Sequence, residues 1–96
     1  HESHTNALRQ LASLLEEQGL DEDAIRCTER LLHHSPANEG AYRRLMRLYS
    51  RLGDSSAAIQ AYHACVAALR EQLDVEPELV TQELYYRLID QRADGQ

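Results

Sequence analysis

The sequence predicts an all-α fold built from repeated helical hairpins. Two observations support this class: the 96-residue chain matches itself at an offset of 34 residues, and apolar residues recur in each unit at the spacing of amphipathic helices. The identical pairs at this offset are Arg9 and Arg43, Leu11 and Leu45, Leu14 and Leu48, Gly19 and Gly53, Ala24 and Ala58, and Ile25 and Ile59. We therefore expect one domain with two hairpins, at about residues 5–38 and 39–73, and a capping helix at about residues 78–92.

The first unit reads as two helices joined at Gly19. The predicted inward face of the first helix is Leu8, Leu11, Leu14 and Leu15. Gly19 ends this helix because glycine adopts the left-handed conformation at little cost. Acidic residues 21–23 then place negative charge at the positive end of the second helix. That helix presents an inward face of Ala24, Ile25, Thr28, Leu31 and Leu32. It ends before Pro36, which cannot continue the hydrogen-bond ladder.

The second unit repeats this plan around Gly53, with Asp54 or Ser55 as the N-cap of its second helix. The predicted inward residues of the first helix are Tyr42, Leu45, Leu48, Tyr49 and Leu52, and those of the second are Ile59, Tyr62, Val66, Leu69 and Leu73. Arg70 stands where the first unit has Pro36, so the second helix is expected to run from about residue 55 to 73. Alanine at positions 24 and 58 fits a close crossing of the two helices.

A break at residues 74–77 precedes the capping helix. Its predicted inward residues are Val80, Leu84, Tyr85 and Leu88. A terminal helix of this kind covers the open end of a repeat stack. We expect the helix to fray from about Arg92.

The composition argues against several classes of protein. The net charge is −6, and a negative chain binds nucleic acid poorly because phosphate contacts need a basic surface. No apolar run reaches the length of a membrane span, and no signal peptide is present. We therefore expect a cytoplasmic protein whose contacts here involve neither nucleic acid nor membrane. The chain starts at His1 rather than Met, which we interpret as a piece of a longer protein.

No pattern predicts an enzyme, a metal site or a cofactor. Residues 1–4 do not match the H-E-x-x-H zinc motif, and His33 and His34 point to different faces of their helix. No nucleophile–base pair, phosphate-binding loop or carboxylate dyad has a usable spacing. Cys27 and Cys65 lack metal-ligand spacing and are expected to pack in the core.

The repeat resembles the tetratricopeptide repeat over residues 5–72. The matching positions are Leu11, Ala12, Leu15, Gly19, Ala24, Pro36, Tyr42, Leu45, Tyr49, Gly53, Ala58 and Tyr62. The fold class is therefore all-α, with tetratricopeptide-like hairpins plus a C-terminal capping helix.

A more particular resemblance is to the bacterial transcriptional activator domain, known from antibiotic regulatory proteins of actinobacteria. The residues that carry it are 45–49, 52–54, 57–62, 73–77, Thr81, Leu84 and Tyr85. The resemblance implies a domain that follows a winged-helix DNA-binding domain, dimerises and contacts the transcription machinery. It also implies that the chain corresponds to the later part of that domain. Asp74 stands where the family usually has glycine, and Glu78-Leu79 replaces a common Ser-Pro, so the joint before the last helix is expected to differ in shape.

A basic stripe is the candidate binding site. Arg43, Arg47 and Arg51 recur every four residues and so follow one face of a helix. In tetratricopeptide units this helix lines the concave groove, where Arg9, Ser13 and Ser50 would join the stripe. Guanidinium groups suit bidentate recognition of carboxylates, which predicts an acidic or C-terminal peptide as the ligand. The alternative is that these arginines pair with the neighbouring acidic helices.

Together these features predict a non-catalytic protein-interaction or dimerisation module of a bacterial transcriptional regulator. Its expected partners are other domains of the same chain, the transcription machinery, or a second copy that pairs through Ala7, Leu8 and Leu11 in a homodimer. A generic repeat adaptor of a multidomain signalling protein is the alternative.

Overall fold

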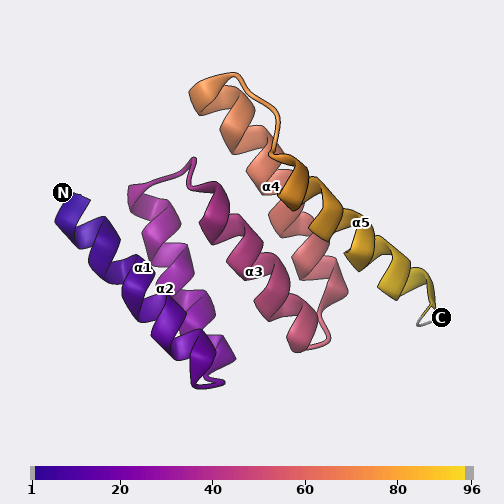
Figure 1. Ribbon diagram of the computed structural model, residues 1–96, viewed down its shortest axis with the longest axis horizontal. Coiled ribbons are helices and arrows are strands. Elements are labelled where there is room, and N and C mark those ends of the chain that lie inside the picture. Colours follow the sequence, from indigo (N-terminus) through magenta and orange to yellow (C-terminus); the bar gives the residue numbers. More distant parts are fainter. Residues whose placement is uncertain (1, 95–96) are drawn as a thin grey trace.

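Helices account for nearly all of residues 2–94, the part of the chain that the computed structural model describes. Within that part there are five helices and no strand, which confirms the all-α prediction. They are α1 (Glu2–Glu17), α2 (Asp21–His34), α3 (Glu39–Arg51), α4 (Ser55–Leu73) and α5 (Leu79–Asp94). Consecutive helices run antiparallel, and α1–α2 and α3–α4 form two hairpins that stand side by side (Figure 1). The arrangement is a tetratricopeptide-like helical repeat.

The two hairpin turns have the same backbone geometry. Gly19 and Gly53 have φ angles of 77° and 80°, in the left-handed region that was predicted for them. In each turn, the N–H of the residue after glycine donates to the carbonyl five residues back: Leu20 to Leu15 and Asp54 to Tyr49, both at 2.9 Å. This bond satisfies a carbonyl that the helix end would otherwise leave unpaired. The two repeat units therefore share the same turn conformation and the same turn hydrogen bond.

Side-chain caps fix the starts of α3 and α4. The side chain of Asn38 accepts a hydrogen bond from the backbone N–H of Ala41 at 3.1 Å. Asp54 does the same for Ala57 at 3.0 Å, which identifies Asp54 rather than Ser55 as the N-cap. The fourth helix has the predicted bounds of residues 55 and 73. Each cap satisfies an N–H that has no partner within its helix.

The joint after α4 is formed by a non-glycine residue in a left-handed conformation. Asp74 has a φ angle of 54°, and its N–H donates to the carbonyl of Arg70 at 3.0 Å. The backbone therefore takes the conformation that glycine favours, although the residue is aspartate. The helix that follows extends to Asp94, past Arg92 where fraying was expected.

The core is centred on α3, which packs against α2, α4 and α5. Met46 and Leu48 are fully buried there, and Leu88 of α5 joins the same cluster. Ala24 and Ala58 are also fully buried, in agreement with the close helix crossing predicted for them. At the C-terminal end, the rings of Tyr62 and Tyr85 stack with a centroid distance of 4.0 Å. Those contacts attach α5 to α4.

Several residues that we predicted to face inward are exposed. They are Leu11, Leu14, Leu52, Leu73 and Val80. Leu11 and Leu14 are 48% and 56% exposed, whereas their repeat partners Leu45 and Leu48 are 7% and 0% exposed. The difference arises because α3 packs against α2, α4 and α5, whereas α1 packs mainly against α2 and reaches α3 chiefly through Glu16 near its C-terminal end. Leu52, Leu73 and Val80 lie at or beyond helix ends, where no neighbouring helix covers them.

Among the described residues, no helix is both long enough and apolar enough to cross a membrane.

Candidate functional site

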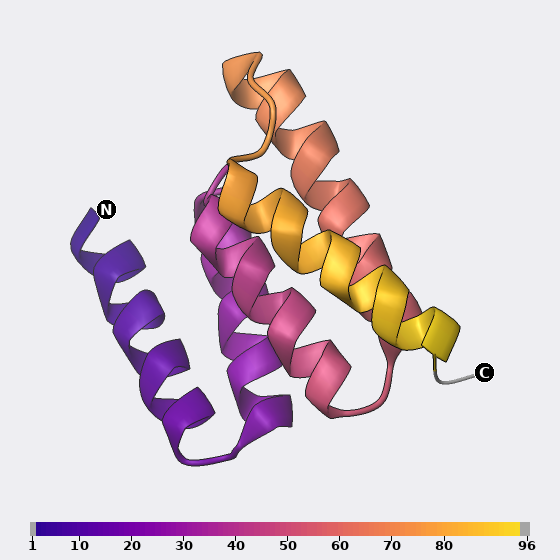
Figure 2. The same ribbon diagram turned by 45° about the vertical axis from the view of Figure 1, so that its right-hand side comes forward.

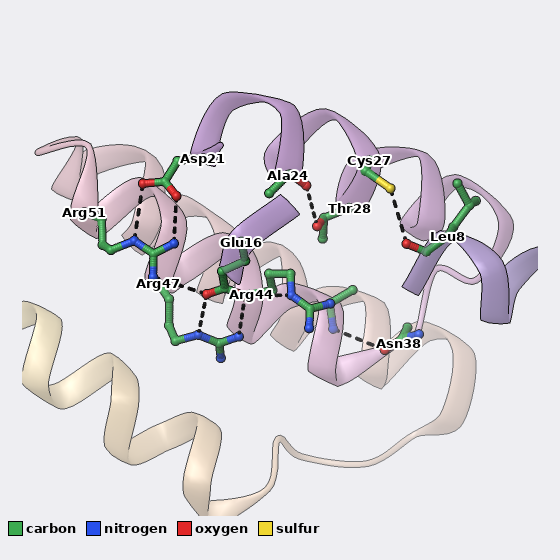
Figure 3. Close-up of polar contacts among 11 residues, drawn as sticks. Leu8, Glu16, Asp21, Ala24, Cys27, Thr28, Asn38, Arg44, Arg47 and Arg51 are labelled. Atoms are coloured by element: carbon green, nitrogen blue, oxygen red, sulfur yellow. Dashed lines mark hydrogen bonds and ion pairs between the residues drawn. The ribbon is translucent and has the colours of Figure 1, made fainter. Parts of the chain in front are cut away.

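Three arginines of α3 converge on one carboxylate of α1 (Figure 3). Glu16 accepts from Nε of Arg44 at 2.9 Å, from Nε of Arg47 at 3.2 Å and from Nη1 of Arg51 at 3.3 Å. The three arginines fall on one side of α3 because their spacings of three and four residues match the helical period. The carboxylate therefore joins the first hairpin to the second.

Arg51 has a second acidic partner at the start of α2. Its Nη2 and Nε donate to the two carboxylate oxygens of Asp21, at 2.7 Å and 3.3 Å, in a bidentate pair (Figure 3). Such paired bonds are stronger and more directional than a single contact. Asp21 also lies in the first turn of α2, where negative charge is favourable.

These contacts shift the acid–base equilibria of the groups involved. Burial raises the pKa of Glu16, but hydrogen bonds from Arg47 and Arg44 outweigh it, so the pKa lies below its ordinary value. The hydrogen bond from Arg51 likewise lowers the pKa of Asp21, and the same bond raises the pKa of Arg51. The carboxylates of Glu16 and Asp21 are thus ionised at neutral pH.

Arg43 points to a different polar cluster, at the start of α5. Its Nη1 donates to the hydroxyl of the fully buried Thr81 at 2.8 Å. Thr81 donates in turn to Glu39, which also accepts from the backbone N–H of Glu78 at 2.7 Å. Glu39 acts as a cap for α5 from another helix, because that N–H has no partner within α5. Arg43 therefore holds the last helix in place.

The six predicted site residues do not all come together. Arg47, Ser50 and Arg51 line a groove between α3 and α5, whereas Arg43 faces the start of α5 and lies outside the groove. Arg9 hydrogen-bonds to Asn6 within α1, and Ser13 is half-buried on the same helix. Nη1 of Arg43 also lies 3.5 Å from a carboxylate oxygen of Glu78 and 3.7 Å from one of Glu39. The pairing of Arg43, Arg47 and Arg51 with carboxylates corresponds to the alternative interpretation of the stripe. Ligand binding at these residues stays a prediction.

The groove between α3 and α5 has a volume of about 240 Å³. Figure 2 shows α3 in front of α2 and α5 in front of α4, which places both walls on the same side of the molecule. Its α5 wall consists of Leu84, Arg87, Leu88 and Gln91, which follow one helical face. Sequence reasoning assigned no site role to these residues because no sequence pattern indicates that α5 returns to lie beside α3. Glu16 and Glu39 were likewise assigned no role, because no sequence pattern indicates that Glu16 meets α3 or that Glu39 meets the start of α5.

Both cysteines are buried and free. Cys27 donates a hydrogen bond from Sγ to the carbonyl of Leu8 at 3.2 Å. Burial raises the pKa of the Cys65 thiol to about 12, so the reactive thiolate is not populated at neutral pH. The predicted packing role of the cysteines agrees with these positions.

The histidines and acids of residues 2–94 form no group of three with metal-ligand geometry. His1 lies outside the described residues. The rings of His4 and His34 meet edge to face with a centroid distance of 4.7 Å, which joins the start of α1 to the end of α2.

Comparisons with known proteins point to transcription. The family described as "Bacterial transcriptional activator domain" matches residues 1–89. The transcriptional regulatory protein MoaR1 of Mycobacterium tuberculosis is 38% identical over 63 residues, which are 66% of this chain and 20% of that protein. MoaR1 of Mycobacterium bovis gives the same values. The match thus spans about a fifth of the length of these curated relatives. No solved structure matches the chain.

Proposed function

Since the chain belongs to the bacterial transcriptional activator domain family, which is a family of regulatory domains, we propose that it is a non-catalytic protein-interaction module of a transcription regulator. Its partners are the transcription machinery, other domains of the same regulator, or a second copy. We place its action in the cytoplasm, where transcription takes place. A generic adaptor in a signalling protein is the weaker reading, because both comparisons name transcription.

The groove between α3 and α5 is the observation that carries this proposal. It presents Arg47, Arg51 and Arg87 and has no acidic lining residue, although the chain as a whole has a net charge of −6. A local excess of positive charge on an acidic protein favours an acidic or C-terminal segment of another protein. Direct contact with nucleic acid is disfavoured by the overall charge.

Binding to purified proteins tests the proposal. We expect the chain to bind bacterial RNA polymerase, another domain of the same regulator or a second copy of itself, measured by surface plasmon resonance with an unrelated acidic protein as the control. Binding to none of them, or turnover in a general screen of hydrolase and transferase substrates, would contradict the proposed function.

Self-association through α1 is the second candidate role. Leu11 and Leu14 of α1 are exposed, and the exposed Ala7 lies one turn before Leu11. Leu8, which was also expected to pair with a second copy, is only 6% exposed and packs in the core, so that part of the prediction is wrong. A contiguous apolar stripe on one helix suits a two-fold contact between copies. Light scattering from micromolar to near-millimolar concentration should show a dimer that Leu14→Glu abolishes. A strict monomer over that range would exclude this role.

A further inference from the structure

We propose that the groove between α3 and α5 binds a peptide segment in which an acidic side chain stands next to an apolar one, with Arg87 as the main charged anchor. This inference rests on the proposed function, since it names the chemistry of the partner. The groove is lined by Arg47, Ser50, Arg51, Leu84, Arg87, Leu88 and Gln91.

The charges around the groove do not balance internally. Three arginines line it, namely Arg47, Arg51 and Arg87, and the carboxylates that contact them are Glu16 and Asp21, which bind Arg47 and Arg51. Arg87 forms no ion pair or hydrogen bond with any other residue in the described part of the chain. A guanidinium group has five N–H donors and is always charged. Arg87 is therefore free to bind a carboxylate of a partner.

The opposite wall supplies further donors without losing its own contacts. Arg47 uses Nε and Nη2 on Glu16, and its Nη1 makes no hydrogen bond within residues 2–94. Its side chain is 41% exposed. A carboxylate held between Arg87 on α5 and Arg47 on α3 would thus receive charge-assisted hydrogen bonds from both walls. Ser50 and Gln91 add neutral donors nearby.

The backbone of the groove favours an acidic side chain over a C-terminal carboxylate. Chain termini are commonly captured by free backbone N–H groups. The walls are the C-terminal end of α3 at residues 47–51 and residues 84–91 of α5, and neither includes the first turn of its helix, so their N–H groups are used within α3 and α5. Recognition here must therefore come from side chains.

The floor of the groove is apolar. Leu88 is 4% exposed, and Leu84 is half-buried one turn earlier on the same face. The volume of about 240 Å³ is below the roughly 300–1,000 Å³ that is usual for drug-sized ligands and cofactors. The groove therefore fits side chains of a peptide, one apolar on the leucines and one acidic on the arginines.

A pair of synthetic peptides tests this chemistry. One soluble peptide carries Glu-Leu-Glu between serines, and its control carries Gln-Leu-Gln in the same frame. We expect fluorescence polarisation to show that the chain binds the acidic peptide at least about tenfold more tightly, because charge-assisted bonds are worth that much. Equal binding of the two peptides, or binding of neither, overturns the proposal.

Variants on α5 locate the site. Arg87→Glu should weaken binding of the acidic peptide by about tenfold or more, since it replaces an attractive charge with a repulsive one. Arg92→Glu is the matched control: it lies on the same helix, is exposed and lies outside the groove lining. Its binding should stay within about twofold of the parent chain. Circular dichroism checks that both variants fold. An equal loss in the two variants would overturn the site.

The two proposals fail separately. If the acidic peptide does not bind but the chain still binds RNA polymerase, another domain of the same regulator or itself, the groove assignment is wrong and the proposed function stands. If the acidic peptide binds through Arg87 while none of these partners binds, the groove assignment holds and those partners are wrong.

Discussion

At the scale of single residues, Glu16 joins α1 to α3 through contacts that its local sequence does not predict. Its side chain is 15% exposed and contacts Arg44, Arg47 and Arg51, which lie 28 to 35 positions later in the chain. One carboxylate thus neutralises part of a basic helix that would otherwise repel itself. The position of Glu16 near the end of α1 makes this contact possible.

Replacement of Glu16 by glutamine should lower stability by about 1–3 kcal/mol at neutral pH, because charged hydrogen bonds to arginine are lost. The pKa of Glu16 is lowered from its ordinary value of 4.5 in the folded chain. Its contribution is therefore present above that value and lost as the pH falls through the folded pKa. Urea unfolding of parent and variant between neutral pH and acid should show the difference shrinking on the acid side. Glu17→Gln, an exposed neighbour, should change stability by less than about 0.5 kcal/mol. A constant difference across pH would contradict this account.

The left-handed backbone conformation of Asp74 is expected to lower the stability of the chain, which can be tested. Its φ angle of 54° is unfavourable for a residue with a Cβ. Asp74→Gly should therefore stabilise the chain by about 0.5–1 kcal/mol. Thermal unfolding can measure this, with Asp74→Ala as the control that should not stabilise. A glycine variant no more stable than the parent would show that Asp74 bears no strain.

At the scale of helices, equal residues in the two hairpins have unequal surroundings. Leu14 and Leu48 occupy the same repeat position, yet only Leu48 is buried, because α2 packs on α3 while no helix packs on that side of α1. The outer face of α1 is thus the repeat's open end. An apolar face shows that a helix can pack against a neighbour on that side, but it does not show that such a neighbour is present.

Leu48→Ala should cost about 2–5 kcal/mol, since it removes a buried side chain and leaves a cavity. Leu14→Ala is the matched control and should cost less than about 1 kcal/mol. Both values come from urea unfolding followed by circular dichroism. Similar losses in the two variants would mean that α1 is covered in solution, for example by a second copy.

At the scale of the whole molecule, stability should be highest in the middle of the stack. α3 contacts α2, α4 and α5, whereas α1 packs on α2 and α5 packs on the second hairpin. Repeat folds are stabilised by nearest-neighbour interfaces, so their ends open more easily than their centre.

Native-state hydrogen exchange followed by mass spectrometry tests this order. Amides of α3 should exchange most slowly, and those of α1 and α5 faster, because an end helix can detach while the rest stays folded. Ligand or partner binding at the groove should slow exchange in α5. Uniform protection of all five helices would instead indicate that the chain unfolds only as one unit.

Sequence alone determined the local architecture of this protein. The 34-residue offset, the glycines at positions 19 and 53, and Asp54 each act on neighbouring residues, so they specified the hairpins, their turns and the bounds of α4. The same signals supported the family resemblance that the family match confirms.

Only the tertiary structure determined which of two residues of the same type is buried, and which partner each arginine contacts. Leu11 and Leu45 share a pattern position, but only the packing of α2 against α3 buries the second. Arg47 pairs with Glu16 because the packing of the helices places α1 beside α3. Arg87 lines the groove because α5 folds back along α3. Local spacing specifies a helix and its faces, whereas the contacts of each face depend on how the helices pack in three dimensions.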